Sequence, residues 1–242
     1  MTIKAMILAA GRGERMRPLT DTTPKPLLDI AGKSLIEYRI EALVDAGIRH
    51  IVINVSYQAE RLIEALGDGK RYGATIEYSV ESERLETGGG IVNALPLLSD
   101  CFIIVNSDIW TDFDFSSLLQ QALKLNSEES PNSALAHLVL VDNPPYHSEG
   151  DLELKNGLIC KKRQGKRENS VTSLTYSGIA IYKKAFFLNA PLEAFRVTKL
   201  WDEPIALGQM TGEYHTGQWR DIGVPERLEA LREALAKRTV LA

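Results

Sequence analysis

The sequence is poor in cysteine, histidine and aromatic residues. Its 242 residues include two cysteines, four histidines and only 7% Phe, Trp and Tyr. Cys101 and Cys160 form no CxxC pair, which excludes a disulfide framework or a cysteine zinc site, and we expect two buried thiols. The histidines have neither metal-ligand spacing nor a Ser/His/Asp pattern, so we expect structural or surface roles for them. They are His50, His137, His147 and His215.

Long apolar runs and an excess of basic residues are also missing. The apolar run within MTIKAMILAAGRG is about six residues long, too short for a signal-peptide core or a membrane span. A net charge of −4 and a pI near 5.7 argue against nucleic acid as a partner, but they allow a local basic pocket. We expect a cytoplasmic protein with small-molecule ligands and no membrane partner. No hexapeptide repeat is present, so we expect a monomer or dimer.

Strand and helix patterns alternate through the first half of the chain. Apolar runs at KAMILAA and at residues 50–55, 74–80 and 101–106 are typical of buried strands. Helical patterns follow at 34–46, 58–66, 88–98 and 116–125, and the first has a capping box from Ser34 to Glu37 and a stop at Gly47. This alternation predicts an α/β fold: a Rossmann-like mixed, mostly parallel sheet with helices on both faces.

The second half has a different pattern. A hairpin is predicted with its turn at Lys155-Asn156-Gly157, followed by the strand TYSGIAIY and a final amphipathic helix that begins at Pro225. That helix should bury Leu228, Leu231 and Leu235. The basic run Lys161 to Arg167 is expected to be a surface loop, and a lid over a phosphate is the alternative.

The stretch LAAGRGERMRPLTDTTPKPLL, residues 8–28, predicts a phosphate-binding loop. It follows a buried strand, so it should lie at the carboxyl edge of the sheet, where ligands bind in such folds. Gly11 and Gly13 let the backbone approach a ligand, and Arg15 and Lys25 supply positive charge. Three prolines restrict the loop, which lowers the entropy cost of ordering it. Together these features suit a triphosphate.

Two other phosphate motifs fail in this region. A dinucleotide fingerprint needs a glycine where Met16 stands, and a Walker A loop ending at GKS needs one at Leu27. We therefore interpret Lys33 as a surface residue and Ser34 as a helix cap.

Two carboxylates suggest a metal site at the same edge of the sheet. Asp108, in VNSDIW, follows an apolar strand, and Asp221, in WRDIG, lies in a short polar break. Two aspartates suit Mg²⁺, which takes few protein ligands beside phosphate and water. Asp112 and Asp114 form a DxD pair that could hold a metal instead, but Asp114 is better placed to cap a helix starting near Ser116.

The segment ETGGGIVNAL places three glycines where we expect a turn before a helix. Such a turn brings backbone N–H groups close to a flat ligand such as a base. Glu81, at the end of the preceding strand, could accept a hydrogen bond from a base N–H or could face solvent.

On these motifs the chain resembles the sugar-1-phosphate nucleotidyltransferases. The residues from Gly11 to Leu27 match the pattern GxGxRxxPLTxxxPKPL, LETGGGIVNAL is similar to the base-binding loop, and Asp108 and Asp221 match two metal positions. The resemblance implies one domain over residues 1–242. It divides into a nucleotide-binding half at about 1–125, a sugar-binding half at about 126–224 and the C-terminal helix at 225–242.

The resemblance also implies roles for individual residues. The nucleotide-binding set is Leu8, Ala10, Gly11, Arg12, Gly13, Glu14, Lys25, Glu81, Thr87 and Gly88. The sugar-binding set is Asn106, Gly150, Asp151, Ser177 and Gly178. Catalysis is expected from Arg15, Lys25 and Asp108, with Mg²⁺ held by Asp108 and Asp221. A sugar phosphate is already ionised, so direct in-line attack on the α-phosphorus of the nucleotide needs charge neutralisation rather than a general base.

Several segments are similar to the uridylyltransferases of peptidoglycan recycling, which implies UTP and N-acetylmuramic acid α-1-phosphate as substrates. Those segments are MILAAGRGERMRPLT, LETGGGI, VNSDIWTDFDF and YSGIAIY. The alternatives are GTP with mannose 1-phosphate, or UTP or dTTP with glucose 1-phosphate. A non-catalytic nucleotide-sugar sensor and a DxD glycosyltransferase are further alternatives, and neither would release pyrophosphate.

Overall fold

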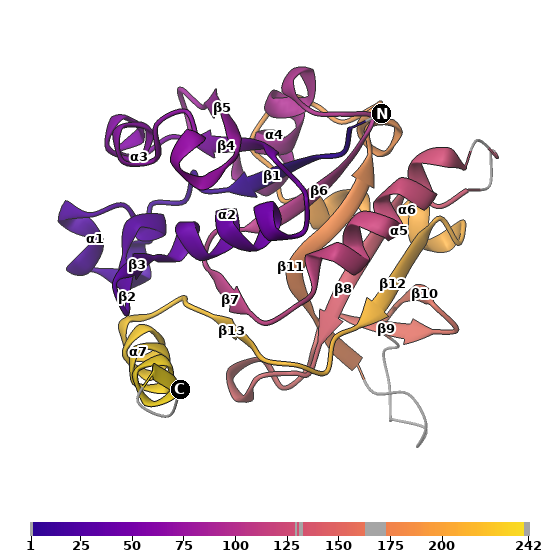
Figure 1. Cartoon of the computed structure of the whole chain (residues 1–242). Helices are drawn as coiled ribbons and strands as arrows, with labels where there is room; N and C mark the ends of the chain where they lie inside the picture. Colours follow the sequence, from indigo (N-terminus) through magenta and orange to yellow (C-terminus); the bar gives the residue numbers. More distant parts are fainter. Residues whose placement is uncertain (1, 129, 131–132, 163–172, 240–242) are drawn as a thin grey trace.

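The computed structural model describes residues 2–128, 130, 133–162 and 173–239. Among these residues nine strands form one sheet in the order β5-β4-β1-β6-β11-β8-β12-β10-β9 (Figure 1). Their bounds are β1 Lys4–Leu8, β4 His50–Val55, β5 Thr75–Val80, β6 Cys101–Asn106, β8 Ala136–Val141, β9 Leu152–Lys155, β10 Leu158–Lys161, β11 Ser173–Lys183 and β12 Met210–Tyr214. Two pairs of short strands form separate sheets: β2 Asp29–Ile30 pairs with β3 Lys33–Ser34, and β7 Ile109–Thr111 pairs with the distant β13 Trp219–Asp221.

The sheet is parallel in its first half and mixed in its second. Strands β5, β4, β1 and β6 pair in parallel, as expected for strands joined by helical crossovers. Strand β11 runs antiparallel between β6 and β8, while β12 runs parallel to β8. The α/β fold with a mixed sheet that the sequence predicts is confirmed.

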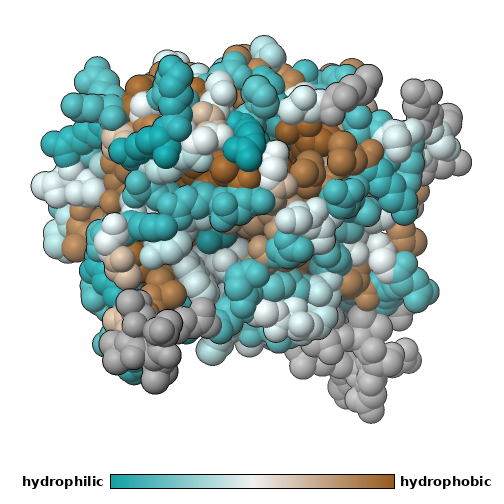
Figure 2. All heavy atoms as spheres, in the orientation of Figure 1, coloured by the Kyte–Doolittle hydropathy of each residue, from teal (hydrophilic) through white to brown (hydrophobic). Residues whose placement is uncertain are grey.

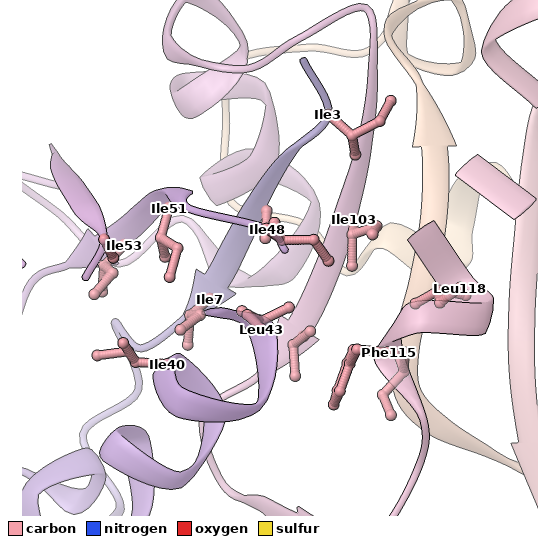
Figure 3. Close-up of a cluster of buried hydrophobic side chains, with 14 of the residues drawn as sticks. Ile3, Ile7, Ile40, Leu43, Ile48, Ile51, Ile53, Ile103, Phe115 and Leu118 are labelled. Carbon is pink, nitrogen blue, oxygen red and sulfur yellow. The ribbon is translucent and has the colours of Figure 1, made fainter. Parts of the chain in front are cut away.

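Helices cover both faces of the sheet, as Figure 1 shows. Side chains alternate along β1, so Ile7 packs with helices α2, α3 and α5 on one face, and Met6 packs with α4 on the other. Figure 3 shows the first of these clusters, where Ile40 and Leu43 of α2 lie beside Ile7, and Leu118 of α5 lies farther along the cluster, near Phe115. The helices are α1 Leu19–Thr22, α2 Leu35–Asp45, α3 Ala59–Leu66, α4 Glu86–Ala94, α5 Phe115–Ser127, α6 Asp202–Ala206 and α7 Pro225–Thr239.

Most local predictions are confirmed. Glu37 accepts hydrogen bonds from the backbone N–H and the hydroxyl of Ser34 at 2.8 and 2.7 Å, as a capping residue does. The turn at Asn156 and Gly157 joins β9 to β10, with φ of 50° and 78°. Helix α7 begins at Pro225, and its buried Leu228 and Leu231 pack against β2 and β7 residues.

Two predictions need correction. Helix α4 begins at Glu86, so the three glycines lie inside the helix rather than in a turn before it. Cys101 is buried as expected, but Cys160 in β10 is only half-buried. Lys161, expected to begin a surface loop that runs to Arg167, is the last residue of β10, and the rest of that run after Lys162 lies outside the described residues.

Polar residues cover most of the face shown in Figure 2, with smaller apolar patches between them. None of the helices in the described part of the chain combines the length and apolar character needed to cross a bilayer.

Candidate active site

A cavity of about 540 Å³ opens at the carboxyl ends of β1, β4 and β6. Leu8, Asn54 and Asn106, the final or next-to-final residues of these strands, contribute to its wall. The loop after β1, the segment before α4 and the segment around Arg196 complete it. This volume falls within the range of small-molecule sites, and this edge is where open parallel sheets bind ligands.

The loop after β1 forms one wall of the cavity. The expected nucleotide residues Ala10, Gly11, Arg12, Gly13 and Glu14 all line it, together with Arg15. Gly13 has a φ of +64°, and a Cβ there would lie 3.0 Å from the Cβ of Lys25. A side chain at this position would therefore strain the backbone and displace Lys25.

Lys25 reaches across the cavity floor. It begins the short 3-10 helix η2 (Lys25–Leu27), and Pro24 and Pro26 flank it. Its Nζ lies 2.6 Å from Oδ2 of Asp108, and its side chain is only 10% exposed. The lysine charge is thus fixed at the end of β6, where phosphate oxygens of a ligand in the cavity would find it.

Asp221 is brought to Asp108 by tertiary pairing. Strand β13 pairs with β7, which places Asp221 opposite Ile109, and the N–H of Ile222 donates to the carbonyl of Asp108 at 2.8 Å. Burial raises the pKa of Asp221 above its usual range, and the negative charge of Asp108 raises it further, against the effect of Lys25 and Arg227. The two carboxylates therefore repel each other, and a shared cation would relieve that repulsion.

The residues present fit a magnesium ion. Arg227 lies 2.6 Å from Oδ2 of Asp221, and Lys25 contacts Oδ2 of Asp108, so these two ion pairs use one oxygen of each carboxylate. Within the described ranges no group of three or more His, Cys, Asp or Glu side chains could hold a metal. A pair of aspartates suits a hard cation that completes its shell with phosphate and water oxygens.

The DxD pair has other partners. Asp114 accepts from the N–H of Ser116 at 2.8 Å as the N-cap of α5, which confirms the capping prediction. Asp112 accepts from the N–H of Gln218 at 2.7 Å and lies 3.0 Å from Nε2 of His215. Both aspartates thus have hydrogen-bond partners within the protein, which favours structural roles for them.

Glu81 is buried in the cavity wall, at 4% exposure, so it is not a solvent-facing strand end. Its Oε1 accepts from Nδ2 of Asn54 at 2.6 Å, and its Oε2 accepts from the N–H of Leu85 at 3.1 Å. Oδ1 of Asn54 in turn accepts from the N–H of Ala9 at 2.8 Å. Glu81 therefore connects the loop after β1 with the segment before α4, a role that the sequence did not reveal.

The glycines of α4 serve close packing. A Cβ at Gly88 would lie 2.2 Å from Phe195, and one at Gly89 would lie 2.0 Å from the carbonyl oxygen of Glu193. The N–H of Gly88 donates to the carbonyl of Phe195 at 2.7 Å, so this donor is already used. Thr87 lines the cavity, whereas Gly88 lies behind it.

Four of the five expected sugar residues are spread over three hollows. Asn106 lines the main cavity and also a hollow of about 220 Å³ that contains Ser177, Gly178, Asp108 and Asp221. The Ser177 hydroxyl donates to the carbonyl of Val139 at 2.7 Å, which indicates a structural role. Asp151 lines a separate hollow with Arg196 and Trp201, and Gly150 lines none of the three.

Sequence analysis missed several residues of the cavity wall. Arg84, Tyr176, Tyr182, Arg196 and Thr198 all line the main cavity. They carry no motif of their own and come from elements that approach the site only in the folded chain. Their residue types alone would not have distinguished them from other surface or core positions.

A glycine–arginine loop at the ends of parallel strands, facing a lysine and two carboxylates, defines an α/β enzyme site for ligands that carry phosphates. Residues 4–238 match the nucleotidyl transferase family, and the chain belongs to that family. The fold and the family expected from the sequence are thereby confirmed.

Curated relatives are similar over most of the chain. The N-acetylmuramate α-1-phosphate uridylyltransferase of Neisseria meningitidis is 46% identical over 94% of this chain and 96% of its own length. A protein of the same name from Caulobacter vibrioides is 32% identical over 96% of this chain and 97% of its own length. The mannose-1-phosphate guanylyltransferase catalytic subunit beta of Xenopus tropicalis is 31% identical over 93% of this chain, which spans 62% of that subunit.

Solved structures share the fold. A Bacillus anthracis protein described as a glucose-1-phosphate thymidylyltransferase, in complex with sucrose, has a TM-score of 0.82 at 20% identity and covers 97% of this chain and 95% of its own. HddC from Yersinia pseudotuberculosis, in complex with GMP-PN, has a TM-score of 0.75 at 25% identity and covers 97% of this chain and all of its own.

Proposed function

We propose that this chain transfers the uridylyl group of UTP to N-acetylmuramic acid α-1-phosphate, giving UDP-N-acetylmuramic acid and pyrophosphate, in the cytoplasmic recycling of peptidoglycan. Relatives named for that activity match this chain over nearly its full length and theirs, at 46% and 32% identity. The observation that carries the reaction type is Lys25, held 2.6 Å from Asp108 at the floor of the cavity.

The protein's main task in this reaction is to bring two anions together. The sugar phosphate is ionised at neutral pH, so its oxygen needs positioning and charge neutralisation more than a base. Lys25 would lie beside the α-phosphate as negative charge develops there. Arg15, on the loop after β1, would stabilise the departing pyrophosphate, and the amides of Gly11, Arg12 and Gly13 would bind the nucleotide phosphates.

Asp108 and Asp221 would hold Mg²⁺, which when bound supplies positive charge to the phosphate oxygens of both substrates. Arg227 forms an ion pair with Asp221, which lines the smaller hollow together with Asp108. The uracil and ribose would lie near Glu81, Thr87 and the start of α4, and the sugar near Asn106 and Tyr176, where the hollows meet.

A pyrophosphate-release assay tests the proposal. It pairs each of UTP, GTP, dTTP and ATP with N-acetylmuramic acid, N-acetylglucosamine, mannose and glucose 1-phosphates, with and without Mg²⁺. We expect the highest kcat/KM for UTP with N-acetylmuramic acid 1-phosphate, dependence on Mg²⁺, and a loss of about 10² or more in rate for Asp221→Asn.

Other outcomes would identify the alternatives. Preference for GTP and mannose 1-phosphate would indicate the activity for which the guanylyltransferase relatives are named. A thermal shift with ligands but no pyrophosphate from any pair would indicate a sensor. Light scattering would test the expected monomer or dimer, and the division into nucleotide and sugar halves also stays a prediction.

A further inference from the structure

Tyr176 lies where the three hollows of the site meet, because it lines all of them. One is the main cavity, and the second holds Asp108 and Asp221. The third lies beyond Tyr176 and has Leu152, Trp201 and Ile205 among its lining residues. A sugar whose phosphate lies at Asp108 can therefore extend past Tyr176 into this third hollow.

Arg196 stands at the boundary between the main cavity and the third hollow and lines both. The backbone on either side of it is anchored to the start of α4. The N–H of Phe195 donates to the carbonyl of Leu85 at 3.2 Å, and the N–H of Val197 donates to Oγ1 of Thr87 at 3.0 Å. The arginine thus projects from a fixed segment, which limits the entropy lost when it binds a ligand.

The charge balance of the third hollow leaves this arginine available. Lys161 pairs with Asp202 at 2.8 Å, and Lys162 pairs with Glu149 at 2.8 Å. Asp151 accepts from the N–H of Tyr176 at 2.9 Å and lies 2.9 Å from Nε2 of His147. Across the described residues, no ion pair or side-chain hydrogen bond of Arg196 is present. A guanidinium group without an anionic partner suits a ligand carboxylate, which it can bind through two parallel hydrogen bonds.

We propose that Arg196 binds a carboxylate on the sugar, the lactyl carboxylate of N-acetylmuramic acid, and so determines which sugar phosphate is used. The inference rests on the proposed function. Under the proposed function, the loop after β1, Lys25 and, through Mg²⁺, the two aspartates already serve the phosphates of both substrates. Arg196 therefore serves a charge that N-acetylglucosamine 1-phosphate lacks. The apolar lining of the third hollow beside it suits the methyl group of the lactyl ether.

The test compares Arg196→Ala and Arg196→Lys with Lys199→Ala. Lys199 is exposed in the same segment and lines none of the three hollows, so it is a matched control for surface charge. Calorimetry measures Kd for UDP-N-acetylmuramic acid and UDP-N-acetylglucosamine, and steady-state assays measure kcat/KM for the two sugar phosphates. Product binding provides a readout even where turnover of N-acetylglucosamine 1-phosphate is slow.

We expect Arg196→Ala to raise the Kd of UDP-N-acetylmuramic acid by about tenfold or more and that of UDP-N-acetylglucosamine by less than about twofold. Arg196→Lys should restore part of the difference, and Lys199→Ala should change neither Kd. An equal rise in Kd for both ligands, or no change in either Kd, would overturn the inference. A wild-type protein that neither uses N-acetylmuramic acid 1-phosphate nor prefers its product overturns the proposed function, and this inference with it, before any variant is considered.

Discussion

Asn54 and Glu81 form a buried hydrogen bond of 2.6 Å between Nδ2 and Oε1, in the wall of the cavity. Oδ1 of Asn54 accepts from the N–H of Ala9, in the loop after β1, and Oε2 of Glu81 accepts from the N–H of Leu85, before α4. Two segments that line the cavity are thus fixed by one pair of side chains. Both residues hold backbone of the cavity wall in position.

Asn54→Ala should destabilise the protein and weaken nucleotide binding together. It leaves the N–H of Ala9 and one carboxylate oxygen of Glu81 buried without a partner, at a cost of about 1–3 kcal/mol in unfolding free energy. Urea unfolding and the KM for UTP measure the two effects. Asn93→Ala is the control. Nδ2 of Asn93 donates a hydrogen bond of 3.0 Å to the Ser79 hydroxyl, and neither residue lines the cavity. An unchanged KM for UTP in the folded variant would refute the positioning role.

Lys25→Ala should lower kcat by about 10² or more, because the cation held at the cavity floor is lost. Lys33→Ala provides the comparison: Lys33 pairs with Glu41 at 2.6 Å on the surface and is half-exposed. Single-turnover measurements with saturating UTP and Mg²⁺ separate the chemical step from binding. Near-normal turnover of Lys25→Ala under these conditions would show that the lysine has no part in the reaction.

Gly89→Ala should unfold the protein at a lower temperature, because the new methyl group would clash with the carbonyl oxygen of Glu193. We expect a loss of at least 1–3 kcal/mol, roughly the cost of overpacking. A Cβ added at Gly11 has no other atom within 4 Å, so the Tm of Gly11→Ala should stay close to that of the wild type even if nucleotide binding weakens. Equal Tm values for the two variants would contradict the close packing at α4.

The two thiols should differ in reactivity. Burial raises the pKa of Cys101 to about 12, so it stays a thiol at pH 8.5, while the half-buried Cys160 is accessible. A thiol reagent should label one cysteine in the native protein and two in denaturant, and Cys160→Ser should abolish native labelling. Native labelling of Cys101 at a rate comparable to that of Cys160 would contradict its burial.

The same raised pKa links Cys101 to stability at alkaline pH. The unfolded thiol ionises near pH ~8.5, whereas the folded thiol keeps its proton to about pH 12. Its contribution to stability is therefore complete below pH ~8.5 and falls as the pH rises toward 12. Denaturation curves of Cys101→Ala should show a smaller decline over this range than those of the wild type.

Local features could be predicted because neighbouring residues determine them. The capping box of Ser34 and Glu37 needs only a spacing of three residues, and the turn at Asn156 and Gly157 needs two residues that tolerate positive φ. The strand before Gly11 is evident from its continuous apolar run, and that run correctly predicts that the next loop lies at the carboxyl edge of the sheet, where the cavity is.

The sequence by itself thus determined most of the elements, the loop that lines the cavity and the family. Only the tertiary structure decided which distant side chains meet there. The β7–β13 pairing brings Asp221 to Asp108, the packing of Phe195 on Gly88 brings Arg196 to the cavity, and burial gives Glu81 its partners. These contacts join residues far apart in the chain, and no periodicity or short motif records them, because they depend on how whole elements pack against one another.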